Sequence, residues 1–517
     1  MKPEPEIPSD PTALRRLVLE LFKALEAKDL ELGHLTAQLQ WLKRRLFGRS
    51  SEKLDPNQLI LELGAWLTAQ PDENPPVVPP PAAEASETPR KGHGRSRLPK
   101  TLARHRTEYH PAPADLVCRE CCQDLKRIGE EVSEQLEYVP ASFFVLEHAR
   151  IKYACPHCQG NVVLGSLPVQ PIDKGLPGPG LLAHVLTSKY CDHLPLNRLE
   201  GIFERHGVDL SRSTLCDWVA AAASRLEPVV KVMKGEVLAS RKIHTDDTTV
   251  PVLDRGKKNK GKTRTGRLWV YVGDSDHEHI VFDYTPDHCR DGPLDFLKGY
   301  KGYLQADAYP GYNVMYAEKG VIEVACWAHA RRKFFDAAKS GAQTARIALG
   351  YIGGLYEIER RARDFTPQAR CALRVAEAKP LLVLFKAWLD AEALKALPKS
   401  PFGQAIRYAR EQWLALVRYL EDGILEADNN RAERALRRIA VGRKNWMFAG
   451  SDEGGRRAAI VYSLIASCAA LNIDPYNYFR DVLTRLATAS PAELVHLTPK
   501  AWKAATDADA AAVAAAA

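Results

Sequence analysis

Long apolar runs are absent from this chain of 517 residues. No stretch of about 18 consecutive apolar residues occurs, so we expect no membrane-spanning helix. The N-terminal segment MKPEPEIPSD is acidic and rich in proline, and it lacks the apolar core of a secretory signal peptide. Most of the 11 cysteines stand singly, as is usual in a protein kept in a reducing cytosol. We therefore expect a cytoplasmic protein of several domains.

Acidic residues are fewer than basic residues in this chain. Lys and Arg number 72 against 64 Asp and Glu, which gives a net charge of +8. The excess is clustered: residues 255–267, RGKKNKGKTRTGR, hold seven basic side chains in 13 positions, and residues 90–106 hold seven with no acid. Clustered positive charge favours a polyanionic partner, most simply nucleic acid. An ordinary basic soluble protein is the alternative.

Leucines recur at heptad spacing near the N-terminus. One seam consists of Val18, Leu25, Leu32, Leu39 and Leu46, and the second consists of Leu14, Leu21, Leu35 and Leu42 with Lys28 as its one interruption. This pattern predicts a coiled coil within residues 1–55 and self-association into a dimer or a larger oligomer. An amphipathic helix packed on its own chain is the alternative.

Two C-x-x-C pairs follow a linker at residues 56–110 that is first rich in proline and then basic. Four thiolates in two such pairs can hold one structural Zn²⁺ tetrahedrally, and the alternating sequence between the pairs suggests strands. We predict a zinc ribbon at residues 111–165. The gap between the pairs is longer than usual, and free thiols are the alternative. The predicted ligands are Cys118, Cys121, Cys155 and Cys158.

Residues 166–236 contain two helical patterns joined by a turn at Gly207. Ser211 or Ser213 can cap the second pattern, which we expect to extend from about 213 to 223. The arrangement resembles a helix-turn-helix whose second helix enters the major groove of DNA. Any helical hairpin would give the same spacing.

The period of the sequence changes at residues 237–450. Three strand candidates, KIHTDDTTVPVL, RLWVYVGD and HIVFDYTP, are followed by a short helix, the strand GYLQADAY, another helix and the strand VIEVACWAH. A helical insertion occupies about 335–425. This order predicts a multidomain α/β protein whose mixed-sheet core resembles the ribonuclease H fold. A helical domain is expected at 451–495, and residues 496–517 are an alanine-rich tail.

Three acids lie on predicted elements that would be close together in such a core. In the ribonuclease H fold the first and fourth strands are neighbours, so Asp246 and Asp307 should face each other, and Glu433 follows on a later helix. Three converging carboxylates can hold two Mg²⁺ (or Mn²⁺) ions, which activate a nucleophilic oxygen and stabilise the leaving oxyanion in phosphodiester cleavage. We expect Asp246 to bridge both ions.

Each acid also has a structural interpretation. Asp246 could be a solvated strand-end residue, and Asp307 could cap the turn after its strand. Asn430 and Glu433 have the spacing of a capping box, in which the glutamate closes a helix N-terminus. If Glu433 only caps, Glu426 or Asp428 would supply the third ligand.

Other residues favour roles around this site. The pair Cys326-x-x-His329 has metal-like spacing but lacks a second pair, so we expect core packing or DNA contact before zinc. Trp446 could stack on a flipped base, although a buried aromatic is more common. Eleven basic residues are expected to contact DNA phosphates. They are Lys257, Lys258, Lys260, Lys262, Arg264, Arg331, Arg332, Arg434, Arg437, Arg443 and Lys444.

Several long segments resemble transposases of the insertion-sequence-66 family. They are HTDDT, GYLQADAYPGY, CWAHARRKFF, EADNNRAERALR, VGRKNWMFAGS and DPYNYFRDVLTRL. The resemblance covers nearly the whole chain. It implies a DDE transposase with a ribonuclease H-like core and places the catalytic acids at Asp246, Asp307 and Glu433. It also implies DNA partners, small accessory proteins of the same element, and a bacterial cytoplasm with the nucleoid as the place of action.

The implied activity has two steps. Water cuts at the ends of the element, and the exposed 3′-hydroxyls then attack target DNA. A nuclease or resolvase on the same fold, which hydrolyses DNA without strand transfer, is one alternative. A DNA-binding regulator without catalysis is another, although a regulator has no need for the three acids.

Overall fold

The computed structural model describes Lys28, Val163, Leu164, Ser166 and residues 142–153, 168–173, 175–254, 262–317 and 320–516. The chain divides into two compact units, residues 1–71 with 150–517 and residues 72–149, and every helix and strand bounded below lies in the first. The predicted leucine heptads and linker lie outside the described residues except for Lys28. The same holds for Cys118, Cys121, Cys155, Cys158, Lys257, Lys258 and Lys260.

A short antiparallel pair precedes the first helices. Strand β1 (Lys152–Tyr153) pairs with β2 (Val163–Leu164), and in sequence these strands stand on either side of the second cysteine pair. Strands were expected in this region, and the zinc ribbon itself stays a prediction.

Three helices precede the main sheet, α3 (Pro179–Tyr190), α4 (Leu196–Arg205) and α5 (Arg212–Leu238). Gly207 turns the chain between α4 and α5 with a φ of +76°, a conformation that glycine adopts without strain. Ser211 caps α5 by accepting the amide of Thr214 at 3.2 Å. The expected end of this helix near residue 223 is wrong, because buried apolar positions continue at helical spacing to its last turn.

The main sheet has five strands in the spatial order β5-β4-β3-β6-β7. Strand β4 pairs antiparallel with β3 and β5, whereas β6 pairs parallel with β3 and β7. Leu268 to Val272 in β4 are all buried, so both faces of this strand are covered. The bounds are β3 (Lys242–Leu253), β4 (Thr263–Val272), β5 (Ile280–Thr285), β6 (Gly302–Gln305) and β7 (Val321–Val324).

The last two strands are shorter than the sequence pattern suggested. Strand β6 ends at Gln305, and Ala308 takes a positive φ of 65° that turns the chain away from the sheet. Strand β7 ends at Val324 because a helix begins at Trp327. The short elements between the strands are α6 (Asp291–Phe296), the 3-10 turn η2 (Pro310–Tyr312) and α7 (Asn313–Ala317).

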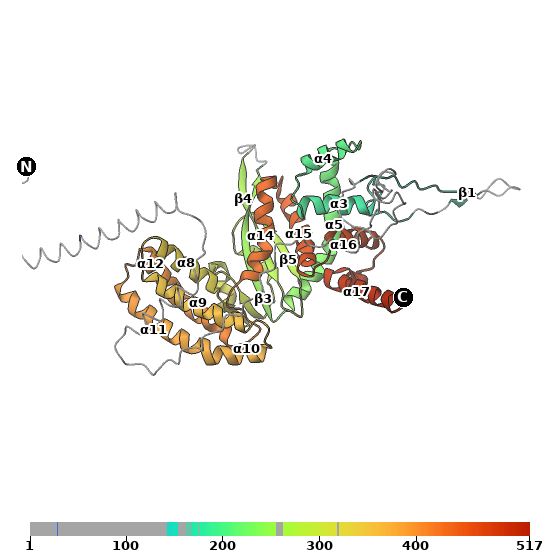
Figure 1. The fold of residues 1–517 in the computed structure, drawn as a ribbon. Coiled ribbons are helices and arrows are strands. Elements are labelled where there is room, and N and C mark those ends of the chain that lie inside the picture. Colours follow the sequence, from blue (N-terminus) through green and yellow to red (C-terminus); the bar gives the residue numbers. More distant parts are fainter. Residues whose placement is uncertain are drawn as a thin grey trace, which may run out of the picture. The chain divides into compact units, whose positions relative to one another are not determined.

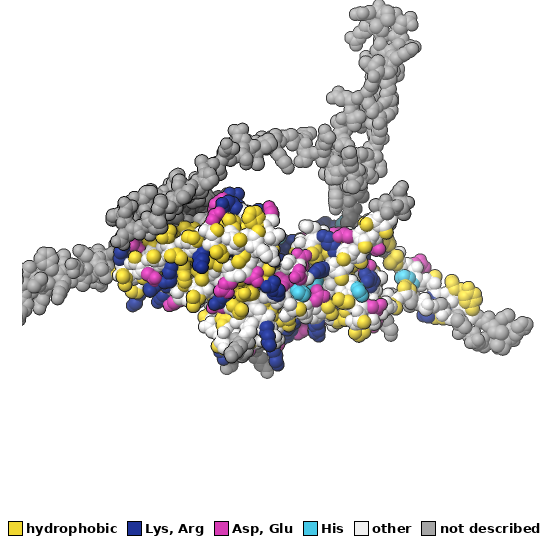
Figure 2. All heavy atoms as spheres, turned by 90° about the horizontal axis from the view of Figure 1, so that it is seen from below, with side chains coloured by type: hydrophobic (Ala, Val, Ile, Leu, Met, Phe, Trp, Pro, Cys, Tyr) yellow, Lys and Arg dark blue, Asp and Glu magenta, His cyan; other side chains and the backbone are white. Residues whose placement is uncertain are grey.

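Helices follow β7, as expected of the insertion (Figure 1). They enclose an apolar core of their own. The rings of Tyr351 and Phe385 stack in this core with centroids 4.8 Å apart. Val383, Leu394 and Leu414 are exposed on its surface. Figure 2 shows apolar patches on the face of the molecule that it draws. The elements are α8 (Trp327–Lys339), α9 (Ala345–Arg361), α10 (Pro367–Leu373), the π-helix η3 (Arg374–Ala378), α11 (Lys379–Lys395), α12 (Pro401–Glu411), α13 (Trp413–Val417) and η4 (Arg418–Leu420).

The chain then returns to the sheet. Helix α14 (Asn430–Trp446) packs along β3 and β4, and α15 (Asp452–Ala470) packs along β5 (Figure 1). Helix α16 (Pro475–Arg485) and the 3-10 segment η5 (Pro491–Leu497) follow. The expected tail is largely a helix, α17 (Pro499–Ala516), whose Trp502 donates to Asp481 at 2.8 Å. Among the described residues, none of the helices is both long and apolar enough to cross a membrane.

Candidate active site

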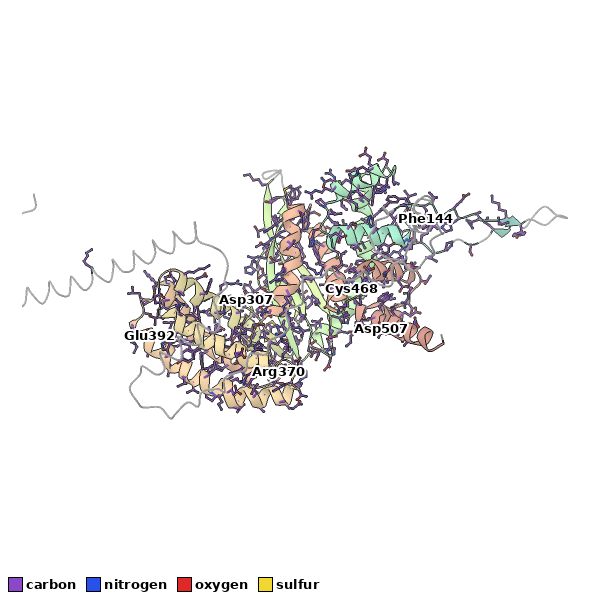
Figure 3. The ribbon with its side chains drawn as sticks, viewed as in Figure 1. Phe144, Asp307, Arg370, Glu392, Cys468 and Asp507 are labelled. Carbon is purple, nitrogen blue, oxygen red and sulfur yellow. The ribbon has the colours of Figure 1, made fainter. Side chains whose placement is uncertain are left out.

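The register of the sheet brings the first two acids together. Strands β3 and β6 run parallel, and their last paired residues are His244 and Gln305. Asp246 and Asp307 each lie two residues further along. The two residues therefore lie side by side at the same end of the neighbouring strands. Asp307, labelled in Figure 3, stands close enough for its charge to act on Asp246.

The third acid comes from helix α14. Glu433 lies in the first turn of this helix, and His329 lies in the first turn of α8. The Nε2 atom of His329 is 3.2 Å from Oε1 of Glu433. The charge of His329 also acts on Asp246 and Asp307, so the imidazole stands among the three carboxyl groups. The Cys-x-x-His spacing was the sequence signal for this residue, but it did not predict a place among the acids.

Asn429 fixes the start of α14 against the sheet. Its side chain is buried, donates to the carbonyl of Thr245 at 2.8 Å and lies 3.0 Å from Nδ1 of His244. Its backbone amide donates to Sγ of Cys326 at 3.1 Å. Gln305 holds the preceding loop, because its Nε2 donates to the carbonyl of Glu426 at 2.6 Å. These contacts set the position of Glu433 relative to Asp246.

The capping-box interpretation of Glu433 is wrong. The N-cap residue is Asn429 rather than Asn430, and its side chain is engaged with β3 instead of the helix. Glu433 therefore stands one position too far along for a capping box. At the start of the helix it is the carboxylate of Asp428 that accepts a backbone amide, that of Asn430, at 3.1 Å. The side chain of Glu433 contacts His329 instead.

The protonation of these groups reflects their crowding. Burial, and after it the charge of Asp307, raises the pKa of Asp246 from 3.8 to about 7. Burial also raises the pKa of Asp307. The hydrogen bond to Glu433 raises the pKa of His329, with help from both aspartates, and the same bond lowers the pKa of Glu433. A bound cation would favour the ionised form of carboxyls whose pKa is raised by burial and by neighbouring negative charge.

The two substitute acids are engaged elsewhere. The carboxylate of Glu426 lies 3.2 Å from the buried Nζ of Lys242 and 3.8 Å from Arg431. Burial raises the pKa of Glu426, but the neighbouring positive groups outweigh this effect and the net pKa is lowered. Asp428 accepts the hydrogen bond of Asn430 described above. Among the described residues, no hydrogen bond or ion pair joins either carboxylate to His329.

Asp247 points to the opposite face of β3 from Asp246. Its carboxylate lies 2.6 Å from Arg267 and 3.3 Å from Nε2 of His288. An ion pair of this kind makes Asp247 part of the sheet's own packing. The neighbouring acids of the HTDDT segment thus have different bonding partners, although the charge of Asp247 still helps to raise the pKa of Asp246 and of Asp307.

A comparison with known protein families identifies the family of this chain. The family model described as "Transposase IS66 family" matches residues 174–457. The chain belongs to the IS66 transposase family. The resemblance seen in the sequence is therefore confirmed. Further models match the zinc-finger binding domain of transposase IS66 at residues 115–159, the IS66 C-terminal element at 463–499, and "Transposase C of IS166 homeodomain" at 34–107.

Three full-length relatives come from Sinorhizobium fredii. The uncharacterized protein y4hP is 35% identical over 501 residues, which cover 91% of this chain and 88% of the relative. The uncharacterized protein y4jD is 31% identical, covering 96% of this chain and 98% of the relative. The uncharacterized protein y4qI is also 31% identical, covering 97% and 98%. The IS66-family architecture therefore spans nearly all of the chain.

The donor atoms of this IS66-family chain fit a hard cation. Asp246, Asp307 and Glu433 offer carboxylate oxygens, which Mg²⁺ and Mn²⁺ prefer. Among the described residues, the group whose ligand atoms all lie within 4.8 Å of one another is Cys326, His329 and Glu433, and the three carboxylates are not drawn together as closely. Burial raises the pKa of Cys326 to about 12, and its sulfur accepts the amide of Asn429. Its burial and this hydrogen bond agree with the expected role of Cys326 in core packing.

The predicted DNA-contacting residues divide by their surroundings. Arg434, Arg437 and Lys444 are exposed along α14, and Lys262 and Arg332 are also exposed. Arg443 is instead tied to β3, donating to the carbonyl of Thr249 at 2.7 Å. Arg264 pairs with Asp452 and donates to Pro286 at 2.8 Å. Arg331 lies over the ring of Phe335.

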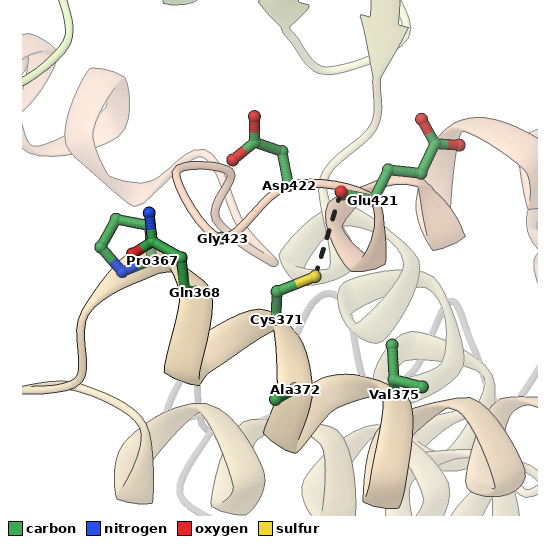
Figure 4. A pocket seen from close by; sticks show the side chains of 8 residues that line it. All are labelled: Pro367, Gln368, Cys371, Ala372, Val375, Glu421, Asp422 and Gly423. Carbon is green, nitrogen blue, oxygen red and sulfur yellow. Dashed lines mark hydrogen bonds between the residues drawn. The ribbon is translucent and has the colours of Figure 1, made fainter.

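Trp446 packs against the main core, which favours the buried alternative over base stacking. A separate pocket lies in the helical insertion, where Cys371 reaches the backbone of residues 420 and 421 (Figure 4). We assign this pocket no role, because none of the three acids or His329 lines it. The pocket residues are Pro367, Gln368, Cys371, Ala372, Val375, Glu421, Asp422 and Gly423.

Proposed function

We propose that this IS66-family chain is a DNA transposase that cuts phosphodiester bonds at the ends of an insertion element and joins the 3′ ends to target DNA. The observation that carries the proposal is the convergence of Asp246, Asp307 and Glu433 around His329, with raised pKa values for both aspartates. Maintaining three crowded carboxyls costs stability, and such a cost is typical of catalytic sites.

The strand arrangement supports a ribonuclease H-like core. Three antiparallel strands are followed by two parallel strands, and the first and fourth strands in sequence are neighbours at the centre. The two aspartates come from those central strands. The third acid lies on helix α14, which packs along β3 and β4 and follows an insertion of about 90 residues at 335–425.

Asp246, Asp307 and Glu433 would hold the divalent cations. When bound, two Mg²⁺ or Mn²⁺ ions would activate the attacking oxygen and stabilise the departing one. The protein's own part is to position the acids, through Asn429 and Gln305, and to orient Glu433 through His329. Positioning and charge neutralisation account for most of the rate enhancement expected in phosphoryl transfer.

Partners follow from the reaction. Two element ends must be held together, so we propose at least a dimer, with the leucine heptads of residues 1–55 as its contact. Element ends and target DNA are the substrates, and accessory proteins of the same element are further partners. We also propose one structural Zn²⁺ on Cys118, Cys121, Cys155 and Cys158, and action at the bacterial nucleoid.

Mg²⁺-dependent cleavage and joining of DNA that carries the element's ends would test the proposal. Glu433→Gln keeps the size of the side chain and loses its charge, so we expect a rate loss of roughly a hundredfold or more with DNA binding retained. Asp428→Asn is the matched control, because it changes a nearby acid that lacks the contact to His329, and it should retain activity.

The products discriminate between the alternatives. With two DNA molecules of different length, strand transfer yields a joined species, whereas a nuclease or resolvase without strand transfer yields cut fragments alone. A regulator would bind DNA and yield neither product. Normal cutting by Glu433→Gln would show that Glu433 is not a metal ligand.

A further inference from the structure

A strained turn with exposed apolar side chains follows helix α14. Met447 has φ 59° and ψ −50°, and the amide of Phe448 donates to the carbonyl of Trp446 at 2.7 Å. This is a γ-turn of the rare form with positive φ, which is strained for any residue except glycine. Met447 and Phe448 are 68% and 39% exposed as whole residues.

The turn is held rigidly on both sides. Trp446 packs against the main core before it. Ala449 is bonded to the end of β3 after it: its amide donates to Pro251 at 2.8 Å, and its carbonyl accepts from Leu253 at 2.8 Å. Strain of this kind persists only where the surroundings enforce it. The folded chain is therefore less stable by the cost of this strain, and it exposes two apolar side chains to solvent.

The outer face of α14 connects this turn to the acids. Arg434, Arg437, Val441 and Lys444 are all exposed and follow one another at intervals of three or four residues, so they form one stripe. The stripe begins beside Glu433, whose pKa is lowered in part by Arg437. It ends three residues before Met447. Positive charge thus runs from the candidate active site to the apolar turn.

We propose that Met447 and Phe448 form a wedge that enters a base step of the bound DNA and unstacks it, while the basic stripe contacts the phosphates. This inference rests on the proposed DNA transposase function. Proteins that kink DNA insert apolar side chains of this type between bases and surround them with basic contacts. A rigid wedge suits this role, because little conformational entropy is lost when it enters the DNA.

The geometry gives the distance from the cut. Trp446 is 13 residues beyond Glu433, and at about 1.5 Å per residue the helix advances about 20 Å between them. For a duplex that lies along α14, with about 3.4 Å per base pair, the wedge reaches a step about six base pairs from the scissile phosphate. Distortion there would bend the element end and present its terminus to the acids.

A fluorescence experiment tests the wedge. Duplexes carrying the element's end would have 2-aminopurine at single positions four to eight base pairs from the cut, and fluorescence would be measured with the full-length protein before metal is added. We expect an increase at about six base pairs. Met447→Gly/Phe448→Ala should lose most of the increase and change DNA affinity by less than about tenfold, because unstacking cost and wedge contact largely offset each other.

Two single variants separate this role from a structural one. Met447→Gly relieves the positive φ, so its melting temperature should equal or exceed that of the wild type while the fluorescence increase falls. Val383→Ala, an exposed apolar change on helix α11 of the insertion, should leave the increase unchanged. The wedge is refuted if the double variant unstacks DNA as the wild type does, or if the wild type cuts DNA without unstacking this region. Failure of the wild type to bind or cut would instead overturn the transposase proposal as well.

Discussion

At the scale of single residues, the site is a compromise between folding and chemistry. Asp246 is largely buried beside Asp307, and its pKa of about 7 shows that the folded chain resists ionising it. His329 offsets part of the charge by its bond to Glu433. These residues are better suited to a cation-bound state than to the metal-free one.

Asp246→Asn should therefore stabilise the metal-free protein at alkaline pH. The folded state binds more protons than the unfolded state between the unfolded pKa of 3.8 and the folded pKa of about 7, so the free energy of unfolding falls as pH rises through this window. At pH 8 the variant should be more stable by roughly 1–4 kcal/mol. Urea denaturation at pH 4 and pH 8 would measure this, and a variant less stable than the wild type at pH 8 would contradict it.

At the scale of elements, helix α14 connects the candidate catalytic acid with the proposed DNA wedge. Its first turn presents Glu433, and its end leads into the strained turn at Met447. Asn429 sets the start of the helix by its bonds to Thr245 and its contact with His244, and the bridge from Ala449 to Val252 sets the chain beyond its end. A helix fixed at two points on β3 can align an acid and a distant contact on one DNA duplex.

Asn429→Ala should lower both stability and activity. The change leaves the buried carbonyl of Thr245 and the His244 ring without their partner, which should cost about 2–3 kcal/mol in the free energy of unfolding. Asn430→Ala is the matched control, since that side chain contacts Asp428 nearer the surface, and it should cost about 0.5 kcal/mol. Equal losses in the two variants would show that the side chain of Asn429 does not fix the helix.

At the scale of the whole molecule, the candidate site is assembled from distant parts of the chain. Asp307 and Glu433 are separated by a helical insertion with its own apolar core. Gln305 and the pair of Lys242 with Glu426 attach the returning chain to the sheet beside the acids. Folding of the insertion and closure of the site are thus linked.

Binding of Mg²⁺ should stabilise the folded chain in a pH-dependent way. A cation that binds only the folded state adds about 2.7 kcal/mol at a hundred times its Kd. Below pH 7 a proton on Asp246 competes with the cation, so the rise in melting temperature at a given Mg²⁺ concentration should be larger at pH 8 than at pH 6. Calorimetry would measure both, and Asp246→Asn should show a smaller rise. An equal rise at both pH values would argue against Asp246 as a ligand.

The sequence by itself determined the family, β3 with its exact bounds, and the three acids as candidates, because these depend on local pattern and on long motifs. It left open whether Glu433 caps a helix, and it did not place His329 among the acids or reveal the strain at Met447. The tertiary structure decided those points. Asn429 turns its side chain to Thr245, which lies far away in sequence, and so displaces the cap by one residue. Contacts between distant segments, not local propensity, select which side chains meet.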